Sequence, residues 1–422
     1  MKKNDLFLPA LLALLSAFLF VSLCFFTTKD TFAQIASGLH NPVLGASALA
    51  QGNAFAARAD DASAITFNPA GITQLQRPEV SLGMSAVYAN VKYRGININE
   101  GRREDMDTII GIPNLYFAAP LIKDKLSAGI GVTVPYGLNG KWNENGFSRF
   151  VVTEFDLTIL NINPTIAFRP LPSLSFGAGP SYYYAETELK SRVPPEGFRK
   201  LDIDGDAFGY NAGMLYQITP SHSVGISFRS KADINLSGKL NLWNLSAQPP
   251  EISSRAKTTL TLPEMLTFGY AYRHGTRWSM EANVQWTNWS RFDILRVETD
   301  PFLGDIEDVR KWENTLGFAM GGEYALSEAV KVRGGYAFHE TPVPSVTFEP
   351  SVPQSSRHAL FTGLEYRWGE NLNKWIDIAY GIVFYEKRTI DNAVGELVPE
   401  ETIDGRYDLL THLFAINFNY RF

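Results

Sequence analysis

The stretch HLFAINFNYRF, residues 412–422, alternates between two kinds of side chain. One parity is mostly aromatic or large and apolar, and the other is mostly small or polar: His412, Phe414, Ile416, Phe418, Tyr420 and Phe422 stand against Leu413, Ala415, Asn417, Asn419 and Arg421. Successive side chains of a β-strand point to opposite faces, so this pattern predicts a strand with one apolar, aromatic-rich face.

The same alternation recurs along the chain, for example at 174–184, 208–217, 315–324 and 330–338. Strands of a soluble sandwich also alternate, but here the second face repeatedly carries Gly, Ser, Asn or Thr while the first is loaded with aromatic residues. That combination is typical of a barrel wall with lipid outside and water or ligand inside.

Fourteen such segments are predicted: roughly 78–93, 112–121, 125–135, 152–169, 173–189, 206–218, 222–240, 254–272, 277–296, 311–326, 329–341, 356–369, 374–387 and 408–422. Short and long spacers alternate between them, as periplasmic turns and external loops do in bacterial outer-membrane barrels. A propeller or a sandwich would not show this rhythm. The sequence therefore predicts an all-β, 14-stranded antiparallel transmembrane β-barrel over 78–422.

Composition narrows the function classes. Against 38 Lys and Arg stand 44 Asp and Glu, so no basic excess exists to neutralise nucleic-acid phosphates. Hydrophobic residues make up 45%, which excludes a disordered chain. The single cysteine, Cys24, allows neither a disulfide framework nor a thiolate metal site, and the six histidines show no metal-ligand spacing. We expect no cofactor and no metal.

Residues 1–33 have the features of a signal peptide. A positive start is followed by an almost wholly apolar run from Leu6 to Phe26 and by small residues before Gln34. The alternative is an uncleaved helical anchor, since about 20 apolar residues can span a bilayer. A lipoprotein site at Cys24 is rejected because Leu23 stands where a small residue is expected.

Residues 34–77 do not fit the strand pattern and are rich in Ala, Gly, Ser and Asn. Small residues pack closely, so this segment is predicted to form a plug inside the lumen; the alternative is a disordered periplasmic tail. Asp60 and Asp61 either pair with lumen cations or start a turn. Pro69 fixes its own φ and favours an extended Asn68, which makes a stiff bend ahead of Ala70. The bend is either a latch or a plain structural turn.

Residues 59–71, ADDASAITFNPAG, resemble the plug motif of the FadL-type long-chain fatty acid transporters through Asn68-Pro69-Ala70. Three further stretches are similar to the same family: LPEM (262–265) leading to WTNWSRFD (286–293), GGYAF (334–338) followed by TPVP (341–344), and GISFRSK (225–231). The resemblance covers 34–422.

This resemblance implies a monomeric barrel in the bacterial outer membrane, in contact with its lipid, with an N-terminal hatch. It implies passive uptake of hydrophobic small molecules, with long-chain fatty acids as the leading ligand. The family also includes members for aromatic hydrocarbons, so an aromatic or alkane hydrocarbon stays open as the ligand.

Two groups of residues are candidates for ligand contact. By parity Arg229, Lys231 and Arg333 face inward, where a cation can hold a carboxylate headgroup or pair with Asp and Glu of the wall. In the expected external loops, apolar residues form clusters that suit first capture of ligand, pack on each other, or mark an aromatic girdle. The members of these clusters that we single out are Phe198, Leu242, Trp243 and Leu245.

The third predicted strand contains Gly129, Gly131 and Pro135, which weaken a ladder and favour bulges or bends. In the family that the chain resembles, this strand is kinked and leaves a gap through which ligand can exit sideways. These three residues are therefore candidates for a lateral gate.

Catalysis finds little support. His222 lies between Ser221 and Ser223, but in an expected short turn, and no nucleophile elbow is present. An outer-membrane lipase is a remote alternative. A general solute porin is a closer one, and the predicted plug opposes it. We expect a transporter and not an enzyme.

Overall fold

The computed structural model describes residues 38–246, 249–391 and 402–422. The predicted signal peptide, with Cys24, and the first four residues of the predicted plug lie outside the described residues.

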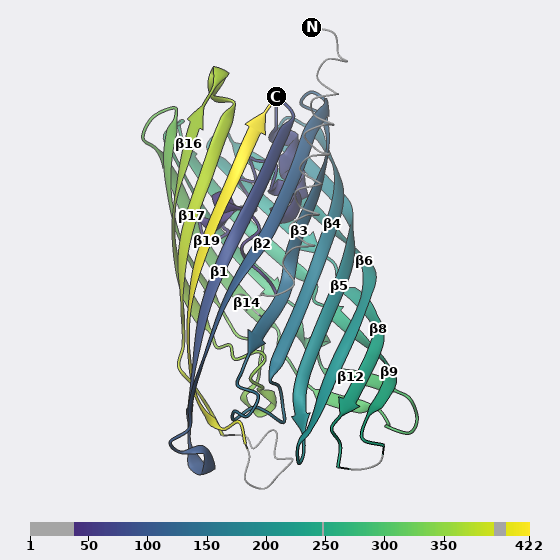
Figure 1. The fold of residues 1–422 in the computed structure, drawn as a ribbon. Coiled ribbons are helices and arrows are strands. Elements are labelled where there is room, and N and C mark those ends of the chain that lie inside the picture. Colours follow the sequence, from purple (N-terminus) through teal and green to yellow (C-terminus); the bar gives the residue numbers. More distant parts are fainter. Residues whose placement is uncertain (1–37, 247–248, 392–401) are drawn as a thin grey trace.

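The strands form one antiparallel sheet that closes on itself, because β1 (Glu79–Gly95) pairs with both β2 (Arg103–Ile122) and β19 (Gly405–Arg421) (Figure 1). The other strands are β3 (Leu126–Lys141), β4 (Glu154–Leu171), β5 (Leu174–Val193), β6 (Gly197–Thr219), β7 (His222–Arg229), β8 (Ala232–Trp243), β9 (Ile252–Leu262), β10 (Met265–His274), β11 (Trp278–Thr287), β12 (Ile294–Thr299), β13 (Ile306–Val309), β14 (Thr315–Ala325), β15 (Val330–His339), β16 (Arg357–Trp368), β17 (Lys374–Tyr385) and β18 (Arg388–Ile390). Five of the crossings are interrupted, namely β7/β8, β9/β10, β11/β12, β13/β14 and β17/β18, so these strands make fourteen crossings. The predicted 14-stranded barrel is confirmed.

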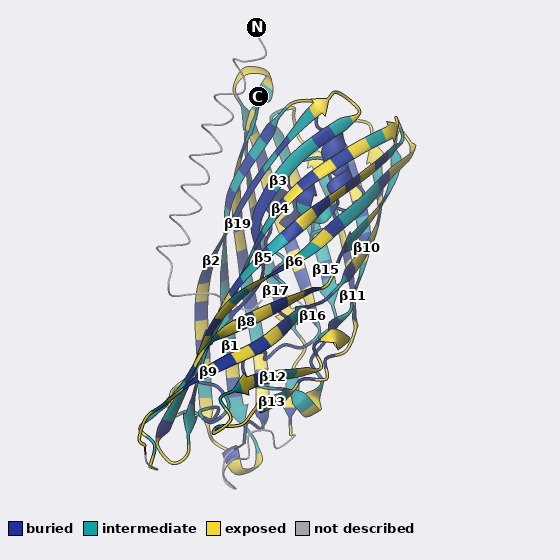
Figure 2. Cartoon of the chain, turned by 90° about the vertical axis from the view of Figure 1, so that its right-hand side faces the viewer, coloured by how far each residue is buried: buried dark blue, intermediate teal, exposed yellow. Residues whose placement is uncertain are grey.

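Side chains alternate across the wall as the sequence pattern requires. Along β19, Phe414, Ile416 and Phe418 are exposed on the outer face, whereas Ala415 and Asn417 are buried on the inner face. Figure 2 shows the same alternation of buried and exposed residues along other strands. An exposed apolar outer face is stable only against lipid, which identifies the membrane-facing band.

On one side of the barrel the polar residues face outward and the apolar residues face inward, the reverse of the arrangement in β19. In β8 the outward residues are polar, as at Asp233 and Lys239, and the inward ones are apolar, as at Ile234 and Leu236. This reversal follows the interruption at 230–231, which shifts the parity between β7 and β8. A polar outer face and an apolar inner face suit a wall standing in water, so β8 and β9, with the adjoining ends of β5 and β6, extend the barrel beyond the membrane.

Most of the long spacers between the predicted strands, which we expected to be external loops, are shorter than predicted. The two that border the extension, 190–205 and 241–253, show this clearly. Residues 190–205 mostly continue β5 and β6 as a hairpin that turns after Val193, and residues 241–253 contain the ends of β8 and β9. The strands continue there, but their outward residues are no longer aromatic, so the pattern used to find strands disappears at the membrane boundary.

The N-terminal segment, residues 38–77, lies against the inner wall near the end of the barrel where the C-terminus lies (Figure 1). It contains α2 (Ala46–Leu49), α3 (Ala64–Phe67) and the 3-10 helix η1 (Pro69–Gln74). The other 3-10 turns are η2 (Asn97–Asn99), η3 (Trp289–Arg291), η4 (Ser345–Thr347) and η5 (Glu370–Leu372). Among the described residues, no helix has the length and apolarity needed to cross a membrane.

Inward glycines of the wall receive the backbone of this segment. An ideal Cβ on Gly225 would lie 2.0 Å from the carbonyl oxygen of Ala56, and one on Gly321 would lie 2.2 Å from that of Gln51. No side chain fits in such a space. The small inward residues thus make room for the chain's own N-terminal segment.

Candidate functional site

A central cavity of about 1170 Å³ lies between the N-terminal segment and the wall. The segment contributes His40, Leu44 and Phe67, and the wall contributes a largely apolar surface. The main apolar residues of the inner surface are Met265, Trp289, Phe361, Val383 and Leu413. The cavity can therefore hold an apolar chain or ring.

Two buried arginines line the central cavity, and neither forms an ion pair within the described part of the chain. Arg229 donates to the Tyr183 hydroxyl at 3.1 Å and to the Thr66 carbonyl at 3.3 Å. Arg357 lies 5.9 Å from the centre of the Tyr385 ring, and its Nη1 has no hydrogen-bond partner. A buried cation without a counter-charge is costly, so an anion that reaches both groups is stabilised there.

The neighbouring His40 adds no charge to the cavity. Burial, then the nearby Arg229 and Arg357, lowers the pKa of His40 to about 3, so the imidazole is neutral at neutral pH. The cavity consequently contains two fixed positive charges, and none of the described residues that line it is a carboxylate.

Asn68 ties the N-terminal segment together and to the wall. Its Nδ2 donates to the carbonyls of Ala56 (2.6 Å) and Met214 (3.0 Å), and its Oδ1 accepts from the Ala70 N–H at 3.2 Å. Its backbone is extended, with φ −159° and ψ 102°, and Pro69 begins η1 directly after it. The predicted bend is present, and its side chain reaches three separate backbone groups.

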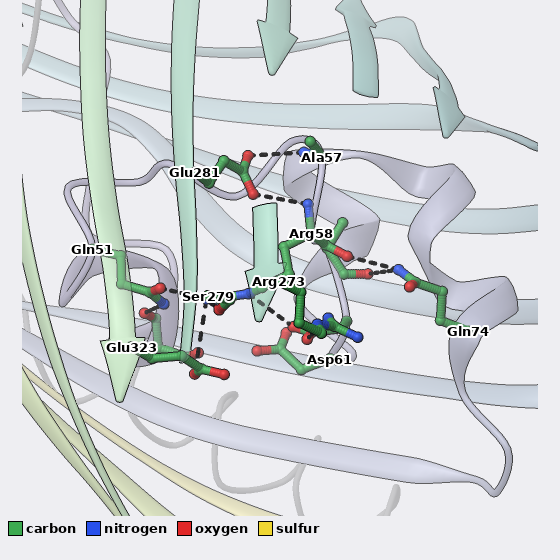
Figure 3. Close-up of polar contacts among 12 residues, drawn as sticks. Gln51, Ala57, Arg58, Asp61, Gln74, Arg273, Ser279, Glu281 and Glu323 are labelled. Carbon is green, nitrogen blue, oxygen red and sulfur yellow. Dashed lines mark hydrogen bonds and ion pairs between the residues drawn. The ribbon is translucent and has the colours of Figure 1, made fainter. Parts of the chain in front are cut away.

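A polar clasp holds the middle of the segment (Figure 3). Glu281 of β11 accepts the backbone N–H groups of Ala57 and Arg58, both at 2.8 Å. The Arg58 guanidinium lies 3.8 Å from the Glu323 carboxylate and 3.3 Å from that of Asp60. Barrel acids thus hold both the backbone and the side chain of this turn.

The two predicted aspartates have different surroundings. Asp60 also pairs with Arg273 of β10 at 3.1 Å, so it connects the segment to a wall cation. Asp61 accepts from the Ser63 N–H at 2.8 Å and forms a local turn. Burial, followed by the nearby Glu79 carboxylate, raises the pKa of Asp61 to about 6.

Of the three cations predicted to face inward, Lys231 does not. It is exposed and pairs with Asp233 at 2.8 Å on the outer face, because the interruption at 230–231 shifts the strand parity. Arg333 faces inward, but Glu323, Glu365 and Asp377 all pair with it, and it does not line the central cavity. Arg229 alone of the three lines the cavity.

The apolar residues predicted for external capture lie at the tip of the extension. Phe198 stacks on Trp243 with ring centres 5.6 Å apart, and Leu245 approaches Gly197. Leu242 pairs with Ile252 in the β8–β9 hairpin. None of the four lines a described cavity, so the packing alternative describes their contacts.

Sequence reasoning missed the apolar interior of the extension. Two neighbouring cavities there, of about 620 and 660 Å³, share Leu189, Leu201, Leu295 and Arg310. It also missed Arg357, although the alternation of the strand that contains Phe361 places Arg357 on the inner face.

The hydrogen-bonded pairing between β2 and β3 covers only part of these two strands, so the ladder is open beyond it. The strands pair only from Leu115↔Val132 to Ile122↔Leu126, and the register of β3 on β4 shifts between Thr133 and Tyr136. Pro135 lies within this shift. Gly129 and Gly131 precede this shift in the chain and lie where β3 still pairs with β2. Both face the side chain of Ile65 from the N-terminal segment.

The N-terminal segment occupies the edge of β3 beyond this opening. Asn41 donates its backbone N–H to Pro135 at 2.7 Å and its side-chain amide to Val134 at 3.1 Å. Gly137 donates to the Leu39 carbonyl at 2.9 Å.

Residues 31–422 match the family described as Outer membrane protein transport protein (OMPP1/FadL/TodX). The chain belongs to this family. It is therefore an outer-membrane protein of a family of transport channels.

Its relatives within the family differ in the cargo that their names give. A long-chain fatty acid transport protein of Escherichia coli O6:H1 is 26% identical over 405 residues, covering 86% of this chain and 89% of the relative. A Pseudomonas aeruginosa FadL homologue has a similar structure, with a TM-score of 0.81, 19% identity, and coverage of 92% of this chain and 100% of the other. The Pseudomonas putida toluene transporter TodX has a TM-score of 0.73 at 17% identity, covering 92% and 100%.

Proposed function

We propose that this protein takes up long-chain fatty acids passively across the outer membrane, with Arg229 and Arg357 holding the carboxylate in the central cavity. The observation that carries the proposal is the presence, in a largely apolar cavity, of two buried arginines that form no ion pair with any residue the structure describes. A carboxylate satisfies both, and the alkyl chain gains roughly 0.8 kcal/mol per buried methylene. A neutral hydrocarbon gains only the second of these terms.

The route begins in the extension. The inner face of the extension is mostly apolar and its outer face is polar. The two cavities there offer a ligand leucine side chains beside the Arg310–Glu349 ion pair, on the water side of the membrane. One barrel contains these cavities and the central cavity, so a monomer suffices for the route.

Exit requires the N-terminal segment, residues 34–77, to act as a hatch. Support comes from Asn68 and from the Glu281 clasp, which hold the segment by polar contacts and not by covalent bonds. The opening of the ladder at Pro135 favours a second, sideways exit between β2 and β3, which Leu39–Asn41 closes in this state.

The test is calorimetric binding of a long-chain fatty acid and of its methyl ester to the detergent-purified protein. Arg229→Gln and Arg357→Gln should each weaken binding of the acid at least about tenfold and leave binding of the ester unchanged. Lys231→Gln is the matched control, since that cation points outward. Equal affinity of wild-type protein for acid and ester would contradict the proposal.

An aromatic hydrocarbon is the second candidate ligand, favoured by Phe67, Trp289 and Phe361 around the central cavity. Toluene binding that exceeds fatty acid binding, and that is insensitive to both arginine substitutions, would favour it. A steady ion conductance in a planar bilayer would instead favour a general porin.

A further inference from the structure

A second cavity, of about 530 Å³, lies on the other side of the hatch from the central cavity. We call it the basin. Its walls are the strand ends and short turns around Arg169, Ser173, Ser221 and Arg273, together with Ala57 and Gln74 of the hatch. Short turns face the periplasm in outer-membrane barrels, so the basin opens on the periplasmic side.

One layer of hatch backbone separates the two cavities. Ala56 lines the central cavity and Ala57 lines the basin. On the wall, Ser227 and Arg229 of β7 line the central cavity, and Ser223 of the same strand lines the basin. Gly225 lies between them, and an added Cβ there would collide with Ala56. The same order holds on β10, where Gly269 approaches Ala56 between Thr267 and Ala271.

The charge of the basin is one-sided. Arg58, Arg169 and Arg273 line it, and over residues 38–246, 249–391 and 402–422 no acidic side chain does. Arg58 and Arg273 share the nearby Asp60 carboxylate, at 3.3 and 3.1 Å (Figure 3 shows the region).

Arg169 forms no ion pair within the described residues. It donates instead to two hydroxyls, those of Ser175 at 3.1 Å and Thr73 at 3.2 Å. The Thr73 hydroxyl already donates to the Ala70 carbonyl at 2.9 Å, whereas the Ser175 hydroxyl accepts from Arg169 and can donate its own proton to a ligand. The further hydroxyls of the basin belong to Ser173, Ser221 and Ser279, and to Ser223, which donates to the Ala57 carbonyl at 2.9 Å.

We infer that the basin is a second carboxylate site, in which Arg169 and the surrounding hydroxyls hold the headgroup of the fatty acid on the periplasmic side of the hatch. This inference rests on the proposed function. Pro172, Leu215, Pro220 and Ala271 offer apolar contact to the first methylenes only, since the volume is about half that of the central cavity. A carboxylate that leaves Arg229 and Arg357 thus finds a new counter-charge one backbone layer away, which avoids an unpaired buried charge in transit.

The test uses a short acid that reports on the basin alone. A fluorophore is placed on Pro170→Cys, which is exposed at the end of β4 and does not line the basin, in protein produced without residues 1–33 so that Cys24 is absent, and quenching by 6-bromohexanoate is titrated in detergent. The methyl ester of this acid is the neutral probe. We expect the acid to quench with at least about tenfold higher affinity than the ester, and Arg169→Gln to abolish that difference.

Arg277→Gln is the matched control, because Arg277 lies in the neighbouring β10–β11 turn and does not line the basin. It should leave the titration unchanged. The label is repeated on Thr219→Cys, at the exposed end of β6 and outside the basin lining, so that a local disturbance by one label does not decide the result. Equal quenching by acid and ester, an unchanged titration in Arg169→Gln, or displacement by inorganic phosphate at concentrations below those of the acid would overturn the inference.

The two proposals fail separately. If the basin assignment is wrong, Arg169→Gln leaves the short-acid titration unchanged while Arg229→Gln still weakens long-chain acid binding. If the proposed function is wrong, long-chain binding is insensitive to Arg229 and Arg357 whatever the basin reporter shows.

Discussion

The side-chain amide of Asn68 donates to the carbonyl oxygen of Ala56 at 2.6 Å, and this bond joins η1 to the turn that separates the two cavities. The same amide group also donates to β6 through the Met214 carbonyl. The Asn68 side chain therefore joins the backbone layer between the two cavities to η1 and to strand β6.

We predict that Asn68→Ala loosens the hatch without unfolding the barrel. The substitution removes three hydrogen bonds and leaves buried backbone groups unsatisfied, at a cost of about 1–3 kcal/mol in hatch docking. Hydrogen-exchange mass spectrometry should show faster exchange over residues 46–74 and unchanged exchange in β19. Gln76→Ala, at an exposed position of the same segment, is the control, and equal exchange in both variants would refute the role.

Hatch docking should strengthen as the pH falls from about 6 towards 4. The pKa of Asp61 is about 6 in the docked state, above its ordinary 3.8, so the docked state binds the proton more tightly than the released state. Docking gains up to about 3 kcal/mol across this window and gains nothing further below it.

Electron-resonance distances between labels on Asn53→Cys and Ser327→Cys measure the released fraction, which should be lower at pH 4.5 than at pH 7.5. Asp61→Asn should remove that difference. A released fraction that rises on acidification would contradict the assignment.

A disulfide between Ala56→Cys and Gly269→Cys should stop passage towards the basin. The Ala56 Cβ lies 3.1 Å from the position of an ideal Cβ on Gly269, slightly less than the separation in a disulfide. That Cβ would also lie 2.5 Å from the Asn283 side-chain oxygen, so the Asn283 side chain has to rotate away for the bridge to form. Uptake of labelled fatty acid into cells should fall on oxidation and recover on reduction, while binding in the central cavity persists. Oxidised protein that transports at the reduced rate would show that this layer need not move.

A second disulfide tests the sideways exit. The side chains of Thr108 in β2 and Asn139 in β3 meet at 3.4 Å across the opened ladder, so Thr108→Cys with Asn139→Cys should join the strands there. We expect oxidation to slow uptake about twofold or more, because it closes one of two exits. Unchanged uptake would remove the wall opening from the route.

The barrel is predictable from the sequence because every strand that crosses the membrane must present apolar side chains to lipid on its outer face, as Phe414, Ile416 and Phe418 do. The outward direction of the Lys231 side chain cannot be predicted in this way. The interruption between β7 and β8 changes which residues face inward, and the apolar–polar alternation of the sequence continues through it without a break. Inward glycines such as Gly225 and Gly321 are visible in the sequence, but which backbone they receive depends on the tertiary fold. The Arg229–Arg357 pair comes from strands far apart in the chain, so only the closed barrel brings both to one cavity.

The most direct measurement of the central claim is the pKa of the bound ligand's own carboxyl group. A long-chain fatty acid labelled with ¹³C at the carboxyl carbon can be titrated by NMR in complex with the protein and in protein-free detergent micelles. Two unpaired arginines should lower the pKa of the bound acid by about 1–3 units relative to the micelle, and Arg229→Gln with Arg357→Gln should reverse this shift. A bound acid that titrates at or above the micelle value would show that it binds as a neutral molecule, and the account of the central cavity would be wrong.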